Sequence, residues 1–421
     1  MHNLHSKNTV RYYVLLAFIL IFLFFSNDFA LTDVQKTAIV IAAGIDREDD
    51  TFIITSQVAI PQSSKQGKAS EAVQIVSRGK TVGDAFEEIN AKTGWYPKLV
   101  FCDFILLGEN ATKENVFDAL DFFLRDEYLT DNCLVATCDG FAKDLLNTTA
   151  LVDPSSSLAM KKVLSSHAER VGTVLPSTLK DFAIGYFSDS KSGFLPILKK
   201  EPQQEEIHGD QSGENSSEQN SSSESSESSQ SSDSSSQSGG GQSAKGGENA
   251  KDKPVFSAKE TALFVSGKRV GKLTEEETFA VASVKNKLRL ASYSVAREGK
   301  TCAFTIRQNN AKTKLNVGKD NTFHLSINLN VTAGLLDYSK AQSLNDLNDA
   351  GDVPKEYFSL AEKKLKGDIA TAFEKTRAVN CDVFGIRERL IKYEKRSLKK
   401  YADTALRDVR VDVKVNFRNI R

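Results

Sequence analysis

Cysteine is scarce in this chain, and its five cysteines follow neither the spacing of a zinc site nor that of a disulfide framework. Cys133 and Cys138 lie on one predicted strand, where a separation of five positions brings two side chains to opposite faces. Cys102, Cys302 and Cys381 stand far apart in the sequence. We therefore expect buried free thiols, and a fold that is stabilised by an apolar core rather than by disulfides.

Motifs for catalysis and for nucleotide binding are also missing. HExxH, GxxxxGK[ST] and GxGxxG do not occur, and the five histidines are too scattered for a metal site or a catalytic triad. Ser177 and Lys180 match SxxK. Ser188–Ser190 and Lys191–Gly193 resemble the other two motifs of penicillin-recognising enzymes, but all three motifs crowd into seventeen residues. We expect Ser177 to cap a helix, the later serines to form a turn, and the chain to be no enzyme, with no catalytic residue, cofactor or metal ion.

Long apolar runs are represented by one segment, the fourteen residues from Tyr12 to Phe25. Lys7 and Arg11 precede this run and no acid does, which is the order of an export signal or a signal anchor. Because positive charge tends to stay in the cytoplasm, the N-terminus should lie inside and the rest of the chain outside.

The run is short for a membrane span, since fourteen helical residues rise about 21 Å against a hydrocarbon core of about 30 Å. A cleaved signal peptide is the main alternative. Cuts after Ser26 or Ala30 would place a large or an acidic residue where a small one is needed. A buried core helix is the third possibility, because the run has no polar face. We expect residues 1–31 to act as an uncleaved anchor.

Net charge is absent, but only because two regions cancel. Residues 201–253 carry eleven acids and three bases, a net −8, so the remainder carries +8. The last 45 residues hold thirteen Lys and Arg against six acids. Such a basic lobe suits anionic lipid or an acidic partner, or it is simply a solvated face. Nucleic acid is not an expected partner, because no nucleic-acid-binding motif is present.

Large apolar residues are missing between Ser212 and Ser243, where seventeen serines occur. A segment of this composition cannot bury enough surface to offset its chain entropy, and we expect it to be disordered. The strand-like runs on either side look like partners in one sheet. The serine-rich tract is therefore predicted to be a long loop inserted into a domain, which chain entropy permits at little cost.

Hydrophobic periodicity predicts alternating strands and helices before this tract, and mainly strands and two helices after it. We expect an α+β or mixed α/β fold of two to three domains, with antiparallel or mixed sheets and flanking helices. The last third is expected to be an α+β unit with an antiparallel sheet. The predicted strands are Thr37–Ile45, Thr51–Ile60, Ala72–Ser77, Val100–Leu107, Cys133–Thr137, Phe194–Leu198, Glu260–Val265, Lys268–Lys272, Thr301–Arg307, Lys312–Val317, Thr322–Thr332 and Val409–Phe417. The main predicted helices are one capped by Thr81, Ser177–Ile184, one opened by a Thr274–Glu277 capping box, Pro354–Phe373 and Ile386–Tyr401.

These patterns predict five regions. They are the anchor or signal in 1–31, an N-terminal mixed α/β domain in 32–200, the disordered inserted loop in 201–254, a middle domain in 255–320 that completes the preceding sheet, and a C-terminal α+β domain in 321–421.

Five stretches go beyond composition. They are Ala42–Pro61 with Gly-Ile-Asp before a charged turn, Gly79–Asn90 with Gly-x-Thr opening a helix, Leu99–Tyr128 ending in Asp-Phe-Phe-Leu-Arg-Asp, Glu260–Thr278 with Val-Gly-x-Leu, and Asn380–Leu390 with Asp-x-Phe-Gly. Together and in this order they resemble the Ger(x)C family, the C subunit of spore nutrient-germinant receptors, over most of residues 32–421.

This resemblance implies a non-enzymatic, three-domain, mixed α/β protein on the outer face of the spore inner membrane. It also implies assembly with a multispanning A subunit and a multispanning, transporter-like B subunit. Family members usually carry a lipid-acceptor cysteine after the signal, and here none lies between Phe25 and Cys102, so lipidation at the usual place is not expected. The serine-rich tract is longer than the resemblance leads us to expect.

The motif residues that carry the resemblance are expected to be structural or to contact other subunits. Glycines such as Gly44 and Gly385 suit special backbone conformations or close packing. Arg125 and Asp126 suit an ion pair or a cap at a helix end, and Asp382 suits an N-cap. The full set is Gly44, Asp46, Gly79, Thr81, Arg125, Asp126, Gly271, Asp382, Phe384 and Gly385.

The function that follows is a membrane-associated receptor subunit needed for germination in response to nutrients. The alternative is another membrane-anchored extracytoplasmic protein of the sporulating cell envelope, with a binding or structural role.

Overall fold

A computed structural model describes most of the chain. The described residues are 11–21, 37–59, 72–150, 153, 155–165, 172–202, 255–318, 320, 322–338, 352–393 and 400–420. Residues 11–21 are helical, whereas the rest of the apolar run and the serine-rich tract lie outside the described residues. Among the helices in these ranges, none is both long enough and apolar enough to cross a membrane.

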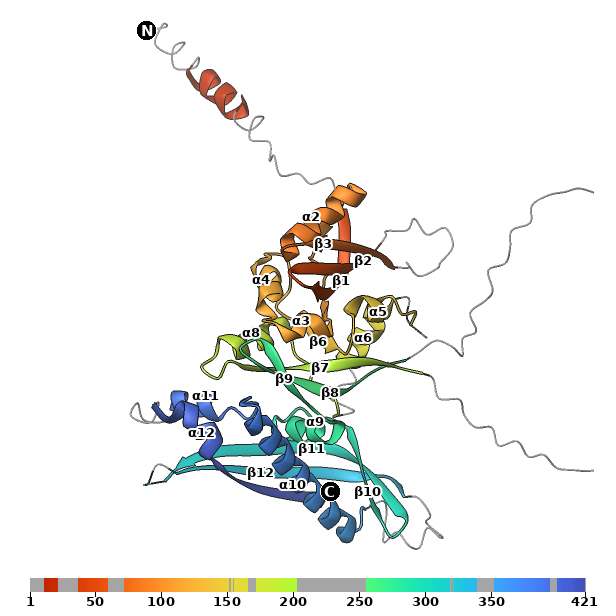
Figure 1. Cartoon of the computed structure of the whole chain (residues 1–421), viewed down its shortest axis with the longest axis vertical. Helices are drawn as coiled ribbons and strands as arrows, with labels where there is room; N and C mark the ends of the chain where they lie inside the picture. Colours follow the sequence, from red (N-terminus) through yellow and green to blue (C-terminus); the bar gives the residue numbers. More distant parts are fainter. Residues whose placement is uncertain are drawn as a thin grey trace, which may run out of the picture.

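A mixed sheet of nine strands organises the first two-thirds of the chain, in the order β3-β2-β1-β5-β6-β7-β8-β9 with β4 beside β1 (Figure 1). Its strands are β1 (Thr37–Glu48), β2 (Thr51–Ala59), β3 (Ala72–Gly79), β4 (Tyr96–Lys98), β5 (Phe104–Leu107), β6 (Leu134–Cys138), β7 (Ser192–Glu201), β8 (Val255–Val265) and β9 (Lys268–Leu273). The hairpin of β1 and β2 is antiparallel, as predicted, and β1, β5, β6 and β7 pair in parallel. Strands β7 and β8 pair antiparallel, from Ser192 with Val265 to Glu201 with Val255.

Helices cover both faces of this sheet, which follows from the alternation of side chains along its central strands. On β5, Ile105 and Leu107 pack with α2, α4 and α8, whereas Phe104 and Leu106 pack with α5 and α6 on the opposite face. The helices are α2 (Val82–Thr93), α3 (Glu109–Lys113), α4 (Phe117–Arg125), α5 (Ala142–Leu146), α6 (Ser156–Leu164) and α8 (Leu179–Phe187).

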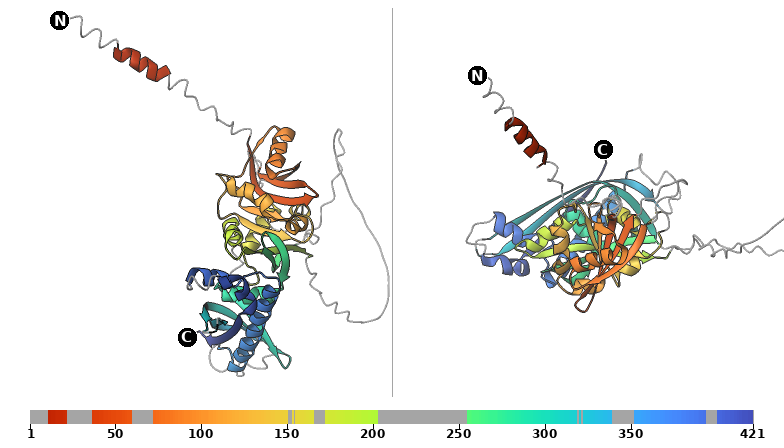
Figure 2. Two further views of the ribbon diagram at one scale, coloured as in Figure 1. Left: turned by 60° about the vertical axis from the view of Figure 1, so that its left-hand side comes forward. Right: turned by 90° about the horizontal axis from the view of Figure 1, so that it is seen from above.

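A second sheet has four strands in the order β10-β11-β12-β13. Each sheet and the helices packed on it form one body, and the two bodies lie one above the other (Figures 1 and 2). Its strands are β10 (Ala291–Arg297), β11 (Lys300–Val317), β12 (Phe323–Tyr338) and β13 (Arg410–Asn419). The helices after and beside it are α10 (Lys355–Ala378), α11 (Ile386–Tyr393) and α12 (Ala402–Asp408). Helix α10 packs its apolar stripe, including Tyr357, Leu365 and Phe373, into the core of this sheet.

Helix α9 (Glu275–Val284) lies between the two bodies and is buried on most of its surface. Thr274 and Glu277 form the predicted capping box at its start. Its Phe279 and Val281 share one core cluster with Leu263 of β8 and Phe304 of β11. The range 255–320 therefore contributes β8 and β9 to the first sheet, and β10 and β11 to the second.

The predicted α+β or mixed α/β class is confirmed, but several details differ. The C-terminal sheet is not purely antiparallel, because β12 and β13 pair in parallel along their whole register. The two strands predicted in 301–317 are one continuous strand, β11, whose register shifts near Ile306 and Gln308 keep it paired with β12. Strand β5 begins at Phe104 because residues 99–102 form a turn. Strand β10 and helix α6 were not predicted.

All five cysteines are buried and free, as predicted. Burial raises the pKa of Cys302 to about 11 and that of Cys381 to about 12. Thiols with such pKa values hold little thiolate at neutral pH, so these side chains act as small apolar core residues.

Candidate functional site at the joint of the two sheets

The Gly-Ile-Asp motif positions helix α5 against the first sheet. The buried carboxylate of Asp46 accepts hydrogen bonds from the backbone N–H groups of Ala142 (2.7 Å) and Lys143 (3.0 Å), at the start of α5. Burial raises the pKa of Asp46, and the two amide bonds oppose this rise. A Cβ at Gly44 would lie 2.5 Å from Leu146 Cδ1, so glycine leaves the space in which α5 packs.

The Gly-x-Thr motif holds the start of α2. The Thr81 hydroxyl accepts from the Asp84 amide at 3.1 Å, and the Asp84 carboxylate accepts from the Thr81 amide at 3.0 Å, which completes a capping box. A Cβ at Gly79 would lie 2.4 Å from the backbone nitrogen of Ala85. Thr81 is therefore a cap, and Gly79 permits β3 and the first turn of α2 to approach each other closely.

Arg125 and Asp126 do not pair with each other. The Arg125 guanidinium binds Asp121 one turn earlier on α4, with Nε to Oδ2 at 2.6 Å, and this hydrogen bond raises the pKa of Arg125. The Asp126 carboxylate accepts from the amides of Tyr128 (2.9 Å) and Leu129 (3.1 Å) and so caps the turn after α4. Arg125 is exposed, so its charge is accessible to a partner.

Gly271 lies on β9 beneath the end of α10. A Cβ at this position would meet Val379 Cγ1 at 3.5 Å, an ordinary van der Waals distance. Space alone therefore does not require glycine here.

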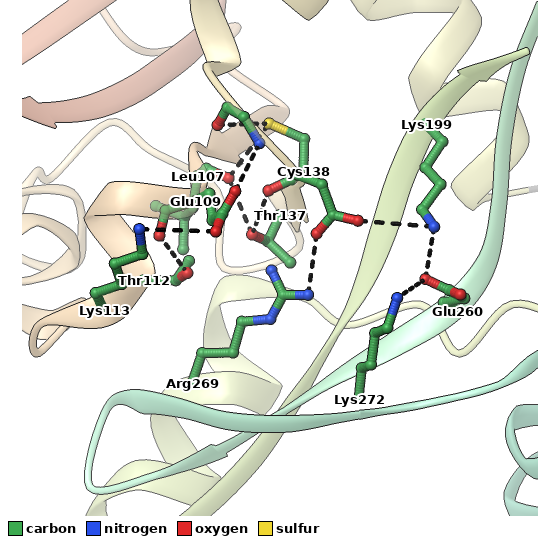
Figure 3. A network of polar contacts seen from close by, with 12 residues as sticks. Leu107, Glu109, Thr112, Lys113, Thr137, Cys138, Lys199, Glu260, Arg269 and Lys272 are labelled. Carbon is green, nitrogen blue, oxygen red and sulfur yellow. Dashed lines mark hydrogen bonds and ion pairs between the residues drawn. The ribbon is translucent and has the colours of Figure 1, made fainter.

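An ion-pair network lies on β7, β8 and β9 of the first sheet. Figure 3 shows its residues Lys199, Glu260, Arg269 and Lys272. Glu260 binds Lys199 (2.7 Å) and Lys272 (3.0 Å). Asp139 binds Arg269 (3.0 Å) and Lys199 (3.6 Å). The network connects the loop after β6 to β7, β8 and β9, and so links strands on both sides of residues 203–254.

We expect the Glu260→Gln variant to be less stable at neutral pH by roughly 1 kcal/mol, because a half-buried networked carboxylate is lost. Partial burial raises the pKa of Glu260, but the bonds to Lys199 and Lys272 lower it more. Because the pKa of this carboxyl is lower in the folded state, its ionised form stabilises the fold at pH values above the unfolded-state pKa of about 4.3. This stabilisation is lost as the pH falls through the folded-state pKa. Denaturation at several pH values should therefore show the wild type and the variant converging below that value. The exposed Glu127→Gln variant is the control, and an equal loss at acidic and neutral pH would contradict the assignment.

The Asp-x-Phe-Gly motif lies at the joint of the two sheets, just after α10. The Asp382 carboxylate accepts from the amides of Ile386 (2.8 Å) and Arg387 (2.7 Å), so it caps α11. Asp382 is 5% exposed, and burial raises its pKa, against the opposing effects of these amides and of the charges on Arg387 and Lys285.

Phe384 and Gly385 complete the turn that brings Asp382 under α11. Gly385 has a φ of 70°, in the left-handed region that favours glycine. Phe384 is buried, and its ring meets that of Phe373 edge-on, with the centroids 5.4 Å apart. The motif therefore fixes the passage from α10 to α11.

This motif also joins the second body to the first. The Asp382 amide donates to the Ser192 hydroxyl of β7 at 2.9 Å. The Cys381 thiol donates to the Phe264 carbonyl of β8 at 3.4 Å. The Arg387 guanidinium donates to the Ser190 carbonyl at 3.5 Å. Three contacts therefore bind Cys381, Asp382 and the start of α11 to the beginning of β7 and to the end of β8.

A cleft of about 480 Å³ opens beside these contacts. Ser188, Ser190 and Gly193 line it from the first body, Lys285 lines it from the end of α9, and Asp382 and Phe384 line it from the second body. The ammonium of Lys285 lies 5.0 Å from the centroid of the Phe194 ring. Nothing in the sequence around Lys285 or Arg387 predicted that they would meet Asp382 here.

The SxxK residues also lie near this cleft but are not arranged as a nucleophile and its base. Ser177 donates to the Thr178 carbonyl at 3.5 Å, and the Lys180 ammonium binds Asp131 at 3.1 Å. The predicted cap at Ser177 was wrong by one position, because Thr178 accepts from the Asp181 amide and caps α8. No group of three or more potential metal ligands occurs in the part of the chain that the structure describes.

The structure thus distributes the motif residues over four places. Gly44 and Asp46 position α5, Gly79 and Thr81 open α2, Arg125 and Asp126 end α4, and Gly271 with the Asp-x-Phe-Gly residues lies close to the joint. At the joint, motif residues line a sizeable cleft.

Comparison with known proteins agrees with this architecture. The family model described as spore germination protein N-terminal domain matches residues 31–200, and the model described as spore germination B3/GerAC-like, C-terminal, matches residues 259–421. No curated protein sequence matches the chain at a significant level. The solved crystal structure of the GerBC protein has a similar fold, with a TM-score of 0.51 and 17% identity over 90% of this chain and 97% of that one.

Proposed function

Because the chain belongs to the Ger(x)C family of spore germination proteins, we propose that it is the non-enzymatic C subunit of a nutrient-germinant receptor, needed for germination in response to nutrients. The observation that carries the proposal is that two domain models of this family match both bodies of the fold, in the family's order. The GerBC structure supports the fold alone at 17% identity.

In this proposal the chain is held at the outer face of the spore inner membrane by its N-terminal apolar run, which is not cleaved. Along the helix of residues 11–21 the large apolar side chains are exposed, among them Tyr12 at 73% and Phe18 at 71%. Such a helix needs a lipid or protein environment. No acceptor cysteine follows the run before Cys102, so lipidation at the usual place does not provide the tether.

The end of the first body at which the chain enters β1 suits a surface close to the membrane. Tyr96 on β4 pairs with Thr37, the first residue of β1. Tyr96, Phe101 and Tyr128 are each at least half exposed, at 50%, 60% and 59%, and the Lys98 ammonium lies over the Tyr128 ring at 5.4 Å. Aromatic side chains with nearby cations favour the membrane–water interface. Figure 1 shows this end nearest to the N-terminal helix.

The partners in this proposal are the multispanning A and B subunits of the receptor. Most of the motif residues position helices and turns, so we propose that their role is to keep the two bodies rigid. Arg125, which is exposed, is the motif residue best placed to contact another subunit.

Removing residues 1–31 tests the tether. We expect the shortened protein to leave the membrane fraction of spores and nutrient-triggered germination to fall to the level of a strain that lacks the gene. Immunoblots of spore membrane and soluble fractions, with germination followed by loss of optical density, measure both effects. A matched strain in which Leu15 and Leu16 are exchanged for isoleucine keeps the apolar run and should behave as the wild type. A shortened protein that stays in the membrane fraction would contradict the tether, and partner subunits or the basic C-terminal lobe would then have to hold it.

A further inference from the structure

Positive and negative charges at the joint do not balance. Asp382 is 5% exposed and Arg387 is 6% exposed, and one negative and one positive charge are thereby buried in the same place. Lys285, which is half-buried and lines the cleft, adds a second positive charge beside them. A cation that is partly withdrawn from water is stabilised by a counter-charge, so this surplus of one positive charge favours the binding of an anion.

The partners of these groups leave the surplus in place. The Asp382 carboxylate is occupied by the two amides of α11. Arg387 donates to Ser190 and to the Asn380 side chain, at 2.5 Å for the latter, and its Nε has no hydrogen-bond partner among the described residues. Glu388 of α11 is paired with Lys392, and Asp181 of α8, which also lines the cleft, is exposed to solvent.

Lys285 faces an aromatic ring rather than a carboxylate. Its ammonium lies 5.0 Å from the centroid of Phe194, and within the described residues no carboxylate oxygen is within 4.0 Å of it. Burial lowers the pKa of Lys285, and the negative charge of Asp382 opposes this. A ring face is a weaker partner for a cation than an anion is, so this ammonium keeps the capacity to bind one.

Space for an anion is present next to this ammonium. Lys285 lines the cleft of about 480 Å³ and also a neighbouring hollow of about 230 Å³, which shares Val383, Phe384 and Arg389 with it. The walls combine hydroxyls of Ser188 and Ser190 with apolar surface of Phe182 and Phe384. This volume is in the range of small-molecule sites, and its lining combines polar and apolar groups.

We propose that the cleft between the two bodies binds a small anion, a carboxylate or phosphate group on a compact body, with Lys285 as its counter-ion. The ligand would contact the first body through the serines before β7, Lys285 at the end of α9, and the second body through the start of α11. Binding would therefore strengthen the joint and fix the two bodies relative to each other. This inference rests on the geometry of the joint and does not depend on the proposed receptor function.

Calorimetric titration of the full-length protein in detergent, at constant ionic strength, tests the proposal. The probes are inorganic phosphate and benzoate, with benzamide as the uncharged counterpart of benzoate. We expect saturable binding of at least one anion at one site per chain, and no binding of benzamide. Comparing the affinities for phosphate and benzoate shows whether the site prefers an inorganic anion or a carboxylate on an apolar body.

Variants at position 285 locate the site. Lys285→Met keeps the aliphatic stem over Phe194 and should weaken binding on the order of tenfold to a hundredfold, because a charge-assisted bond is lost. Lys285→Arg should retain binding, and Lys314→Met, on the exposed face of β11, is the matched control. Without anion, the thermal midpoint of Lys285→Met should be no lower than that of the wild type, because a half-buried charge without a carboxylate partner has been removed.

Three results would overturn the proposal. They are the lack of saturable binding of either anion by the wild type, equal binding of benzamide and benzoate, and unchanged anion affinity in Lys285→Met. The comparison of benzamide with benzoate uses the wild type alone, so it decides the question even where the Lys285→Met chain does not fold.

Discussion

Replacing Asp382 with alanine should lower the free energy of unfolding by about 3 kcal/mol, a large fraction of the total for a typical domain. Two short hydrogen bonds from the amides of Ile386 and Arg387 are lost, and both amides are left without this partner in a buried turn. The buried Arg387 and the half-buried Lys285 also lose a nearby negative charge. Burial of the charged carboxylate is itself unfavourable, as the raised pKa of Asp382 indicates. The loss of stability in the alanine variant is therefore smaller than the sum of the separate hydrogen bonds.

Denaturation of the full-length protein in detergent measures this effect. Asp382→Asn keeps one acceptor oxygen and should lose less than the alanine variant. Asp412→Ala, at an exposed position on β13, removes the same side chain where it has no such role and should change stability by less than about 0.5 kcal/mol. An Asp382→Ala loss no greater than that of Asp412→Ala would show that the cap and the joint do not need this carboxylate.

Adding one methyl group at Gly79 should destabilise the protein by at least about 2 kcal/mol, because the new Cβ would lie 2.4 Å from the Ala85 nitrogen and 2.6 Å from the Thr81 carbonyl oxygen. Both collisions are with backbone atoms, which no change of rotamer relieves. Relief requires β3 and α2 to separate, and the capping box of Thr81 and Asp84 would then be disturbed.

The same substitution at Gly367 should have the opposite sign. Gly367 is an exposed interior residue of α10, and a Cβ there would meet no atom within 4 Å. Alanine is favoured over glycine in a helix interior by about 1 kcal/mol, so Gly367→Ala should stabilise the protein by roughly that amount. Denaturation midpoints of the two variants, measured together, should move in opposite directions from the wild type. A shift of Gly79→Ala in the same direction as Gly367→Ala would show that the close approach of β3 to α2 is not required.

Local features of the fold could be predicted from the sequence because their causes lie within a few residues. The capping boxes at Thr81 and Thr274 join residues three positions apart, and the amphipathic stripe of α10 repeats within one helix. The hairpin of β1 and β2 follows from two alternating runs around a charged turn.

The joint could not be predicted in the same way. The bond from Asp382 to Ser192 connects residues 190 positions apart, and the one from Arg387 to Ser190 connects residues 197 positions apart. Periodicity within a window carries no information on such pairs. Lys285 is a further example, because a lysine at the end of a helix is normally solvated, whereas here it is half-buried between Phe194 and the segment that leads into α11.

Strand direction in the second sheet is another long-range property. The alternating pattern of residues 409–417 predicts a strand but not its orientation, which depends on where α10 returns the chain. With α10, α11 and α12 between β12 and β13, the last strand enters parallel to β12, with His324 opposite Arg410.

These contacts give a physical explanation for the motif residues. Asp46 and Asp382 are both buried carboxylates that accept two amides at the start of a helix. Gly44 and Gly79 both mark places where a Cβ would meet a neighbouring element. We therefore propose that the motifs maintain the two bodies and their joint, so that the exposed surfaces are held in fixed positions for the other subunits.

Germination of spores that lack this gene tests the central claim most directly. Spores of an in-frame deletion strain, compared with the same strain carrying the wild-type gene, are exposed to the nutrients that trigger the parent, and loss of optical density is followed. The account predicts that the deletion spores fail to germinate with nutrients that act through this receptor and that the restored gene recovers the response. Normal nutrient-triggered germination of the deletion spores, in a strain without a second copy of such a receptor, would contradict it.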